Sequence, residues 1–303
     1  METKCKECLA DFKSVASLNK HIKCHGITLP DYYVKHYARK NLLTGELLPF
    51  KDAYSYFEHD FVNAQQMNKW CRENSPEIVK PYILNKLIKR KEEKELKYAP
   101  PSLELKISRM PSVEIYRQHF GSYGKAAKAA GLDFWYKDSL PKDFDIVPEL
   151  EILVDTREQK PLFFKKSSVL KLDLGDYGIG GEHYNYTFVD RKSESDFKGT
   201  MTLGNERFRA EMQRARDFGC FIFVVIECSI SDIYAHNNFK NFHKANIEFI
   251  WHQMKELQRD YMDCCQFIFA ESREKAGILI PKLLYHGKKL WKCDMQYFLE
   301  NKL

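Results

Sequence analysis

Residues 184–191 constrain the fold more than any other segment, because polar and apolar side chains alternate along them. A β-strand places successive side chains on opposite faces, so Tyr186, Phe188 and Asp190 share one face. Lys192 returns to the face of Asp190, about 7 Å further along. The pattern predicts a strand that brings a carboxylate and an ammonium to the same place at its end.

Other carboxylates follow apolar runs upstream of this strand. Residues 152–154 indicate a buried strand that ends at Asp155, and Asp176 follows a second expected strand over 168–173. The glycine-rich residues 178–181 favour a turn. Carboxylates beside a lysine are typical of metal-dependent phosphodiester cleavage, because carboxylates hold divalent cations and the ammonium orients a water molecule or the phosphate.

The order of these motifs resembles a known family. Asp-x-Lys at the end of a strand, with a carboxylate on a neighbouring strand, is similar to the core of the PD-(D/E)xK nucleases. The chain resembles the nuclease domain of the XPF-type endonuclease family in its series of motifs: Val-Asp-Thr-Arg-Glu (154–158), Gly-Asp-Tyr (175–177), Asp-Arg-Lys-x3-Asp (190–196), Gly-Asn-Glu-Arg-Phe (204–208) and the strand 221–227. The resemblance implies an α/β fold for residues 151–303, with a restriction-endonuclease-like central mixed sheet flanked by helices.

The resemblance also implies roles for single residues. Mg²⁺ or Mn²⁺ would be held by Asp155, Asp176 and Asp190, and Lys192 would be the catalytic lysine. The other charged residues of the catalytic set would be Arg157, Glu158, Arg191 and Asp196, and Arg207 would bind DNA near the site. The family usually has glutamate where this chain has Asp190, a conservative change that alters metal distance or rate.

The N-terminal residues carry a second metal-binding motif. Cys5, Cys8, His21 and His25 have the Cys-x2-Cys-x12-His-x3-His spacing of a C2H2 zinc finger. About 25 residues bury too little surface to fold alone, so we expect structural Zn²⁺ to stabilise a small ββα finger over residues 1–28. Cys24 competes with His25 as a ligand. In a helix over 15–23, Lys20 is a candidate for contact with DNA.

The region after the finger is expected to be mostly helical. Residues 29–100 predict a helical connector, with a helix over 81–98. Residues 101–137 contain a predicted helix, a tight Gly-Ser turn and a second helix that ends at Gly131. This segment is similar to the helix-turn-helix repeat beside the catalytic domains of many homing endonucleases, in which case Tyr123, Lys125 and Lys128 approach DNA. The alternative is a helical hairpin that packs on the nuclease. A polar linker, 138–150, follows.

Three further elements are expected in the nuclease region. A helix over 205–217 places Phe208, Met212 and Ala215 on a core face. Its arginines 209, 214 and 216 would form either a solvated face or a track for phosphates. A helix over 244–260 and a strand over 266–270 complete the prediction.

Composition limits the classes of protein that the chain can belong to. Its 303 residues, 44% of them hydrophobic, can form a sizeable core. No long apolar run or secretory leader is present, so we expect an intracellular protein without a membrane span, in the cytoplasm of a bacterial host if phage-encoded or in the nucleus if eukaryotic. The nine cysteines are expected to be reduced, and the net charge of +6 is compatible with DNA.

Together these features predict a Mg²⁺-dependent DNA endonuclease that leaves 3′-hydroxyl and 5′-phosphate ends. We expect no tandem helix-hairpin-helix module after residue 270, so the finger and the helical repeat would target it, as in phage or mobile-element enzymes. Branched or flapped DNA, typical of repair or recombination, and a defined duplex site are both open as substrates. A double-strand break would need a homodimer or two successive nicks. The alternative function is a DNA-binding regulatory protein with an inactive nuclease fold.

Overall fold

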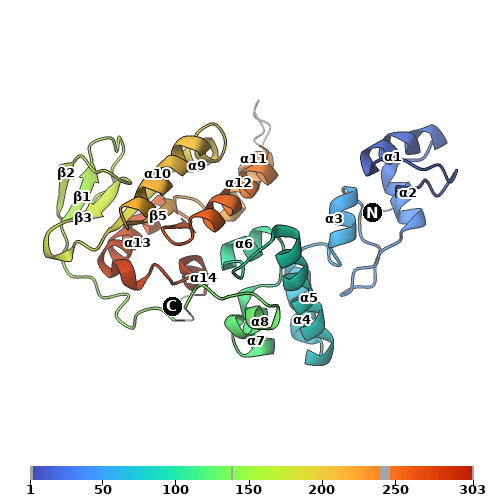
Figure 1. The fold of residues 1–303 in the computed structure, drawn as a ribbon, viewed down its shortest axis with the longest axis horizontal. Coiled ribbons are helices and arrows are strands. Elements are labelled where there is room, and N and C mark those ends of the chain that lie inside the picture. The colour runs from blue at the N-terminus through green and yellow to red at the C-terminus, as the bar shows by residue number, and fades with distance from the viewer. Residues whose placement is uncertain (1–2, 138, 239–245, 302–303) are drawn as a thin grey trace. The chain divides into compact units, whose positions relative to one another are not determined.

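The computed structural model describes residues 3–137, 139–238 and 246–301 and divides into two compact units. Unit 1 comprises the chain up to Ala99 together with Leu105–Phe134, and unit 2 comprises Pro100–Glu104 together with the chain from Trp135 onward (Figure 1). Asp138 of the predicted linker and Lys244 of a predicted helix lie outside the described residues. Within the described part of the chain, no helix is long and apolar enough to span a bilayer.

Unit 1 begins with the expected finger. An antiparallel bridge joins Lys4 to Asp11, and helix α1 (Val15–Ile22) follows, continued by the 3-10 turn η1 (Lys23–His25). The helix starts after Ser14 because the Ser14 side chain accepts a hydrogen bond from the backbone N–H of Ser17.

The core of the finger continues into the helices that follow it. Helices α2 (Leu29–His36) and α3 (Ala53–Glu58) contribute Tyr32, Tyr33 and Tyr56 to one apolar cluster with Leu18 and Ile22 of α1. The Tyr32 hydroxyl also accepts a 2.8 Å hydrogen bond from the backbone N–H of Lys6. The finger is therefore packed against its neighbours and does not rest on its own core alone.

The long helix of the connector begins earlier than predicted. Helix α4 (Ala64–Glu73) is followed by α5 (Pro76–Lys94), whereas 81–98 was expected. The reason is that Pro76 suits the first turn of a helix, where no N–H partner is needed. The buried stripe of Val79, Ile83 and Leu87 then continues through Pro81, so packing outweighs the hydrogen bond that Pro81 lacks.

The two helices and the tight turn predicted for residues 101–137 are present, and their role as a DNA-binding repeat stays a prediction. A short helix α6 (Ser102–Ile107) precedes α7 (Val113–Phe120) and α8 (Tyr123–Ala129). Gly121, with φ +81°, ends α7, and the Ser122 side chain caps α8. Lys125 and Lys128 are exposed on α8, but Tyr123 is only 2% exposed and packs against Tyr116 and Phe134. This corrects the prediction for Tyr123, whose ring belongs to the core.

Unit 2 contains the expected mixed sheet flanked by helices. Its strands are β1 (Ile152–Asp155), β2 (Ser167–Leu170), β3 (Tyr177–Ile179), β4 (Thr187–Lys192), β5 (Phe221–Ile226) and β6 (Cys265–Phe269). They lie in the order β2-β1-β3-β4-β5-β6, and β3 is antiparallel to both of its neighbours while the other pairs are parallel.

Two strand predictions need correction. Residues 177–179 form β3, although the glycines from Gly178 onward favoured a turn, because all three residues are buried between β1 and β4. Strand β4 starts at Thr187 and not at residue 184, since Tyr186 has a φ of +63°, which no regular strand can contain.

Helices cover both faces of the sheet (Figure 1). The β5 residues Phe221, Phe223 and Val225 share a core cluster with α13 (Arg273–His286), whereas α9 (Glu194–Met201), α10 (Asn205–Asp217) and α12 (Ile247–Asp260) contact the sheet through aromatic residues such as Phe197 and Phe208. The predicted bounds of α10 and its core face are confirmed. Helices α11 (Ile230–Asn238) and α14 (Met295–Glu300), with the short turns η2 (Gly181–His183) and η3 (Gly287–Lys289), complete the unit.

Candidate active site

The candidate site lies at the edge of the sheet where β1 and β4 end and β3 begins. Because β3 runs antiparallel to both neighbours, Asp155, Asp176 and Asp190 reach the same edge. Backbone hydrogen bonds of 2.8 Å connect the three strands there, from Asp155 N–H to the Asp176 carbonyl and from Asp176 N–H to the Val189 carbonyl. The topology thus gathers carboxylates that are distant in sequence.

Gly175 allows this close approach of β3 to β4. Its φ is +62°, and a Cβ atom at this position would lie 2.8 Å from the carbonyl oxygen of Val189. The Gly175 N–H donates a 3.2 Å hydrogen bond to Oε1 of Glu211 on α10. A larger residue would push apart the two strands that carry Asp176 and Asp190.

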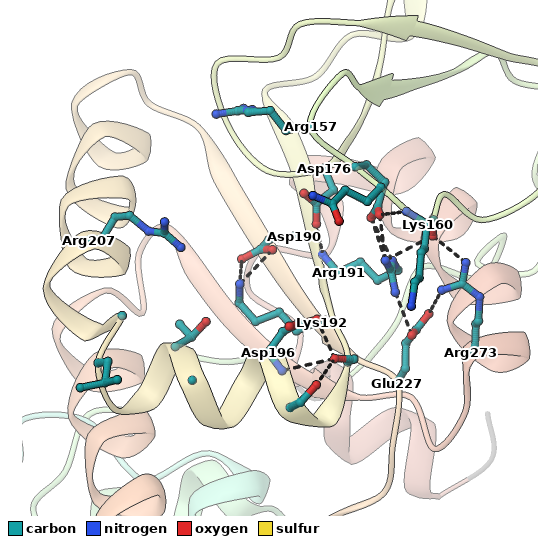
Figure 2. Close-up of a pocket in the computed structure, with 18 residues that line it drawn as sticks. Arg157, Lys160, Asp176, Asp190, Arg191, Lys192, Asp196, Arg207, Glu227 and Arg273 are labelled. Carbon is teal, nitrogen blue, oxygen red and sulfur yellow. Dashed lines mark hydrogen bonds and ion pairs between the residues drawn. The ribbon is translucent and has the colours of Figure 1, made fainter.

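An open cavity of about 1340 Å³ covers this edge of the sheet. One wall is formed by residues 157–160 with Arg273, and the other by α9, the start of α10 and the turn between them. Figure 2 shows Arg207, from α10, across the cavity from Lys160 and Arg273. Asp176, Asp190 and Lys192 line the cavity between these walls.

Lys192 and Asp190 form an ion pair on the same face of β4, as their alternation predicts. The Lys192 Nζ atom lies 2.9 Å from Oδ2 of Asp190 and donates a 3.2 Å hydrogen bond to Oδ1. Oδ2 is buried and lacks a partner with hydrogen-bond geometry. Burial disfavours the ammonium, but the charges of Asp190 and Asp176 outweigh it and raise the pKa of Lys192.

Asp176 carries the most perturbed carboxyl group of the cavity. Burial and then the charge of Asp190 raise its pKa to about 8, although the Arg191 backbone N–H donates a 2.8 Å hydrogen bond to its Oδ2. The nearby ammonium of Lys192 also opposes the rise. Asp176 and Asp190 therefore concentrate more negative charge than Lys192 neutralises.

The Arg191 side chain points away from Asp176 and Asp190 and forms ion pairs with other residues. Its guanidinium lies 2.9 Å from Glu158 and 2.8 Å from Glu227, and all three side chains are buried. Arg273 lies 3.0 Å from Glu227 and donates to the Lys160 and Pro161 carbonyls (Figure 2). The network fixes the 157–161 wall to the ends of β4 and β5.

Asp155 lies beneath the cavity and is not among its lining residues. Its Oδ1 accepts hydrogen bonds from the N–H and Nε of Arg157, at 2.8 and 2.6 Å, and its Oδ2 accepts one of 2.6 Å from the Leu172 N–H. Burial opposes its ionisation, but these donors lower the pKa of Asp155. The structure thus gives Asp155 a fully bonded position, and its role as a metal ligand stays a prediction.

Asp196 and Arg207 lie on the wall made by α9 and α10. Asp196 is exposed in the first turn of α9, where its Oδ2 accepts a 2.6 Å hydrogen bond from the Ser193 hydroxyl. The Asp196 N–H in turn donates a hydrogen bond of 3.2 Å to the Ser193 hydroxyl oxygen. This is the arrangement of a helix cap. Arg207 is exposed and lines the cavity, as expected for a residue near the site.

Comparison with known proteins gives a partial likeness. No protein-family model matches the chain, and no curated protein matches it. Among solved structures it is similar to XPF from Aeropyrum pernix, with 19% identity and a TM-score of 0.34 over 44% of this chain and 63% of that chain. The same protein in complex with DNA gives 18% identity and a TM-score of 0.34 over 45% and 64%. The chain therefore spans less than two thirds of the length of these structures.

The second candidate metal centre lies in unit 1. The ligand atoms of Cys5, Cys8, His21 and His25 lie within 4.8 Å of one another, and among the described residues they form the one group of this kind that could hold an ion. Burial opposes a thiolate at Cys5, but the N–H groups of Cys8 and Glu7 outweigh it and lower its pKa. Cys24 is exposed outside the group, so the geometry favours His25 over Cys24.

Several residues of the cavity were missed in the sequence. They are Lys160, Glu227 and Arg273, together with Glu211, which does not line the cavity but accepts a hydrogen bond from Gly175. Glu211 could have been found, because it falls among the apolar positions of α10, three residues after Phe208, where a charge is out of place. Glu227 follows β5 directly, in register with the end of β4. Arg273 carries no comparable signal.

The remaining arginines of α10 are partly explained. Arg209 pairs with Asp260 at 2.7 Å, and Arg216 hydrogen-bonds the carboxylate of Asp263 through its Nε at 2.8 Å. Asp260 is the last residue of α12 and Asp263 follows it, so these arginines connect α10 to the end of α12 and do not form a free track for phosphates. Arg214 is exposed, so a solvated position and contact with a phosphate both remain predictions for this residue.

Proposed function

We propose that the protein is a metal-dependent DNA endonuclease that cuts phosphodiester bonds to leave 3′-hydroxyl and 5′-phosphate ends. The observation that carries the proposal is the juxtaposition of Asp176, Asp190 and Lys192 in an open cavity on the edge of a mixed sheet. Two acids and a lysine with this arrangement match the needs of phosphodiester hydrolysis, in which charge develops on several oxygens at once.

The donor atoms suit a divalent cation. The buried Oδ2 of Asp190 accepts no hydrogen bond and has only the ion pair with Lys192, while burial and then the charge of Asp190 raise the pKa of Asp176. Carboxylate oxygens are the protein ligands that Mg²⁺ and Mn²⁺ prefer. Asp176 and Asp190 would hold the ion, which when bound supplies Lewis acidity to the scissile phosphate and acidity to a water ligand.

The chain's own residues would orient the substrate around these carboxylates. The ammonium of Lys192 can donate to the attacking water or to a phosphate oxygen while remaining paired with Asp190. Arg207 and Lys160, on opposite walls, can each pair with a phosphate of the DNA backbone. The ion network of Arg191 holds the Arg191 N–H against Asp176, which keeps that carboxylate turned toward the cavity.

The residues of unit 1 would target the cut. With Zn²⁺ bound, the finger would present Lys20 to DNA, and α8 would present Lys125 and Lys128 to the phosphates. All three lysines are exposed.

A digestion assay tests the proposal. With Mg²⁺ or Mn²⁺, wild-type protein should cut plasmid DNA, whereas Asp176→Asn and Lys192→Ala should bind DNA in fluorescence anisotropy without cutting it. Lys166→Ala is the matched control, because Lys166 is an exposed lysine outside the cavity. Cutting by either site variant at the rate of Lys166→Ala would refute the assignment of these residues.

Two further outcomes define the substrate and the alternative function. Cleavage of a fork and a junction in preference to a random linear duplex library would indicate a structure-specific enzyme, and the reverse a site-specific one. If wild-type protein binds DNA but cuts none of these substrates with any divalent cation, the protein is a DNA-binding protein with an inactive nuclease fold. In that case Asp176→Asn would leave DNA binding unchanged.

A further inference from the structure

The turn between α9 and α10 presents one apolar side chain to solvent. Leu203 is 101% exposed, the largest exposed fraction among the hydrophobic residues that the structure describes. Its neighbours in the chain point the other way, since Met201 and Phe208 are buried in the core of unit 2. Leu203 therefore projects from a turn that is anchored on both sides by residues buried in the core of unit 2.

Hydrogen bonds hold the turn in this conformation. The Gly204 N–H donates a 2.9 Å hydrogen bond to the Gly199 carbonyl, and the Thr202 hydroxyl donates one of 2.8 Å to the Lys198 carbonyl. A Cβ atom on Gly204 would lie 3.2 Å from Cα of Thr200, so the backbone approaches closely here. The exposure of Leu203 is thus a property of an ordered turn.

The exposure of Leu203 is of interest because this residue lines the cavity of the candidate site. Single exposed leucines are common on protein surfaces and need no explanation. Leu203, however, lines the same cavity as Asp190 and Lys192, next to Gly204 and one turn before Arg207. The other lining residues are mainly charged or polar, so Leu203 offers an apolar contact among them to whatever the cavity binds.

Within the proposed function, the apolar part of the substrate is the face of a nucleobase. Leucine is among the side chains that proteins insert between base steps, where they unstack the bases and bend the duplex. Arg207 on the same wall can hold the adjacent phosphate while the leucine contacts the base. The spacing of one helical turn allows both contacts from a single wall.

We propose that Leu203 contacts an unstacked base beside the scissile phosphate, so that the preferred substrate is DNA with mismatched or unpaired bases at the cut. The preference follows because a mismatched base costs less to unstack than a paired one. This inference rests on the proposed nuclease function and deepens it, since it names the local state of the DNA that the cavity selects.

A binding experiment tests the contact without cleavage. The probe is a duplex with 2-aminopurine at a central mismatch, mixed with Lys192→Ala protein so that no strand is cut. We expect its fluorescence to rise on binding, because the base leaves the stack, and the rise to be lost when Leu203→Ala is added to the same protein. Leu203→Met should restore it. An equal rise with and without Leu203→Ala overturns the inference, whatever the outcome of any cleavage assay.

A cleavage experiment then measures the preference. The wild-type protein should cut a mismatched duplex faster than its matched counterpart, and Leu203→Ala should reduce cutting of the mismatched duplex by about tenfold, the effect of losing the burial of one leucine side chain. Leu170→Ala is the control, because Leu170 is 52% exposed but lies on β2 outside the cavity. An unchanged preference in Leu203→Ala contradicts the proposal. Absence of all cutting by wild-type protein instead contradicts the nuclease function, and the fluorescence assay still decides the role of Leu203.

Discussion

The Lys192 Nζ atom lies 2.9 Å from Oδ2 of Asp190, two residues earlier on the same strand. This pair leaves Asp176 without a full countercharge, because one ammonium faces two buried carboxyl groups. We expect the charge balance of the cavity, rather than any single contact, to favour the binding of a cation.

Lys192→Met should separate cation binding from chemistry. Without the ammonium, Asp176 and Asp190 attract a divalent ion more strongly, so the Kd for Mn²⁺ should fall in a calorimetric titration. Cutting should nevertheless slow by about 10²–10³-fold, as expected when a donor to the transition state is lost. Lys166→Met provides the control for loss of a surface lysine. A parallel loss of Mn²⁺ binding and cutting would contradict this division of roles.

The pH dependence of stability should report on Asp176. Its pKa is about 8 in the folded protein and near 3.9 in the unfolded chain, so the folded state binds the extra proton between these values. Stability without metal should therefore fall as the pH rises from 4 to 8, by up to about 1.4 kcal/mol per pH unit from this group. Urea unfolding in EDTA measures the effect. Asp176→Asn should flatten that part of the curve, and identical slopes for the two proteins would count against the raised pKa.

The Arg191 network should stabilise unit 2. Glu158→Gln removes one of the two carboxylates that pair with the Arg191 guanidinium and leaves Glu227 as its partner, so the free energy of unfolding should fall by about 1.5–3 kcal/mol, the contribution of hydrogen bonds to a charged group. Arg273→Ala breaks a pair in which Arg273 is 43% exposed, and its effect should stay below about 1 kcal/mol. Chemical denaturation of both variants checks the order. A larger loss for Arg273→Ala would mean that its bonds to the 160–161 carbonyls dominate.

Asp155→Asn should act on folding more than on cation binding. The carboxylate of Asp155 accepts bonds from Arg157 and from the Leu172 N–H, and hydrogen bonds to a charged group contribute about 1.5–3 kcal/mol. We expect a lower melting temperature and a nearly unchanged Kd for Mn²⁺. A Kd that rises about as much as in Asp176→Asn would instead establish Asp155 as a metal ligand, which requires Arg157 to move aside.

Loss of zinc should affect unit 1 beyond the finger itself. Because Tyr32 and Tyr33 share a core with Leu18 and Ile22, Cys5→Ser should remove bound zinc and expose α2 and α3 to proteolysis. Elemental analysis and limited trypsin digestion follow the two effects. Cys24→Ser should retain one zinc per chain, since this thiol lies outside the cluster. Cutting of nonspecific DNA should survive both changes, and its loss in Cys5→Ser would contradict a separate targeting role.

The parts of the molecule that could be predicted are those governed by local periodicity or spacing. The shared face of Asp190 and Lys192 follows from the period of a strand, and the buried face of α10 from that of a helix. The Cys/His cluster follows from ligand spacing. These patterns are written in consecutive residues, so no knowledge of distant contacts is needed.

The corrections arise where tertiary packing decides. Strand β3 contains a glycine and is short, and only its burial between β1 and β4 makes it a strand. Tyr123 has the amphipathic side chain of a DNA-contacting residue, but its ring fills a space beside Tyr116. Arg273 reaches the site from a helix whose sequence carries no sign of the sheet edge that it meets. Such partners are known only once the chain is folded.

The path of the chain between the two units sets a limit on how the protein can be dissected. Pro100–Glu104 belongs to unit 2, although it interrupts unit 1, and there Ser102 donates to Asp294 through its N–H at 2.6 Å and its hydroxyl at 2.7 Å. Burial raises the pKa of Asp294, and these bonds oppose the rise. A fragment that began at residue 138 would lack Ser102 and would leave this buried carboxyl group with the Tyr297 N–H as a donor but without the two bonds from Ser102. A fragment meant to contain the whole of unit 2 must therefore begin at residue 100 or earlier, so no single peptide bond separates the two units.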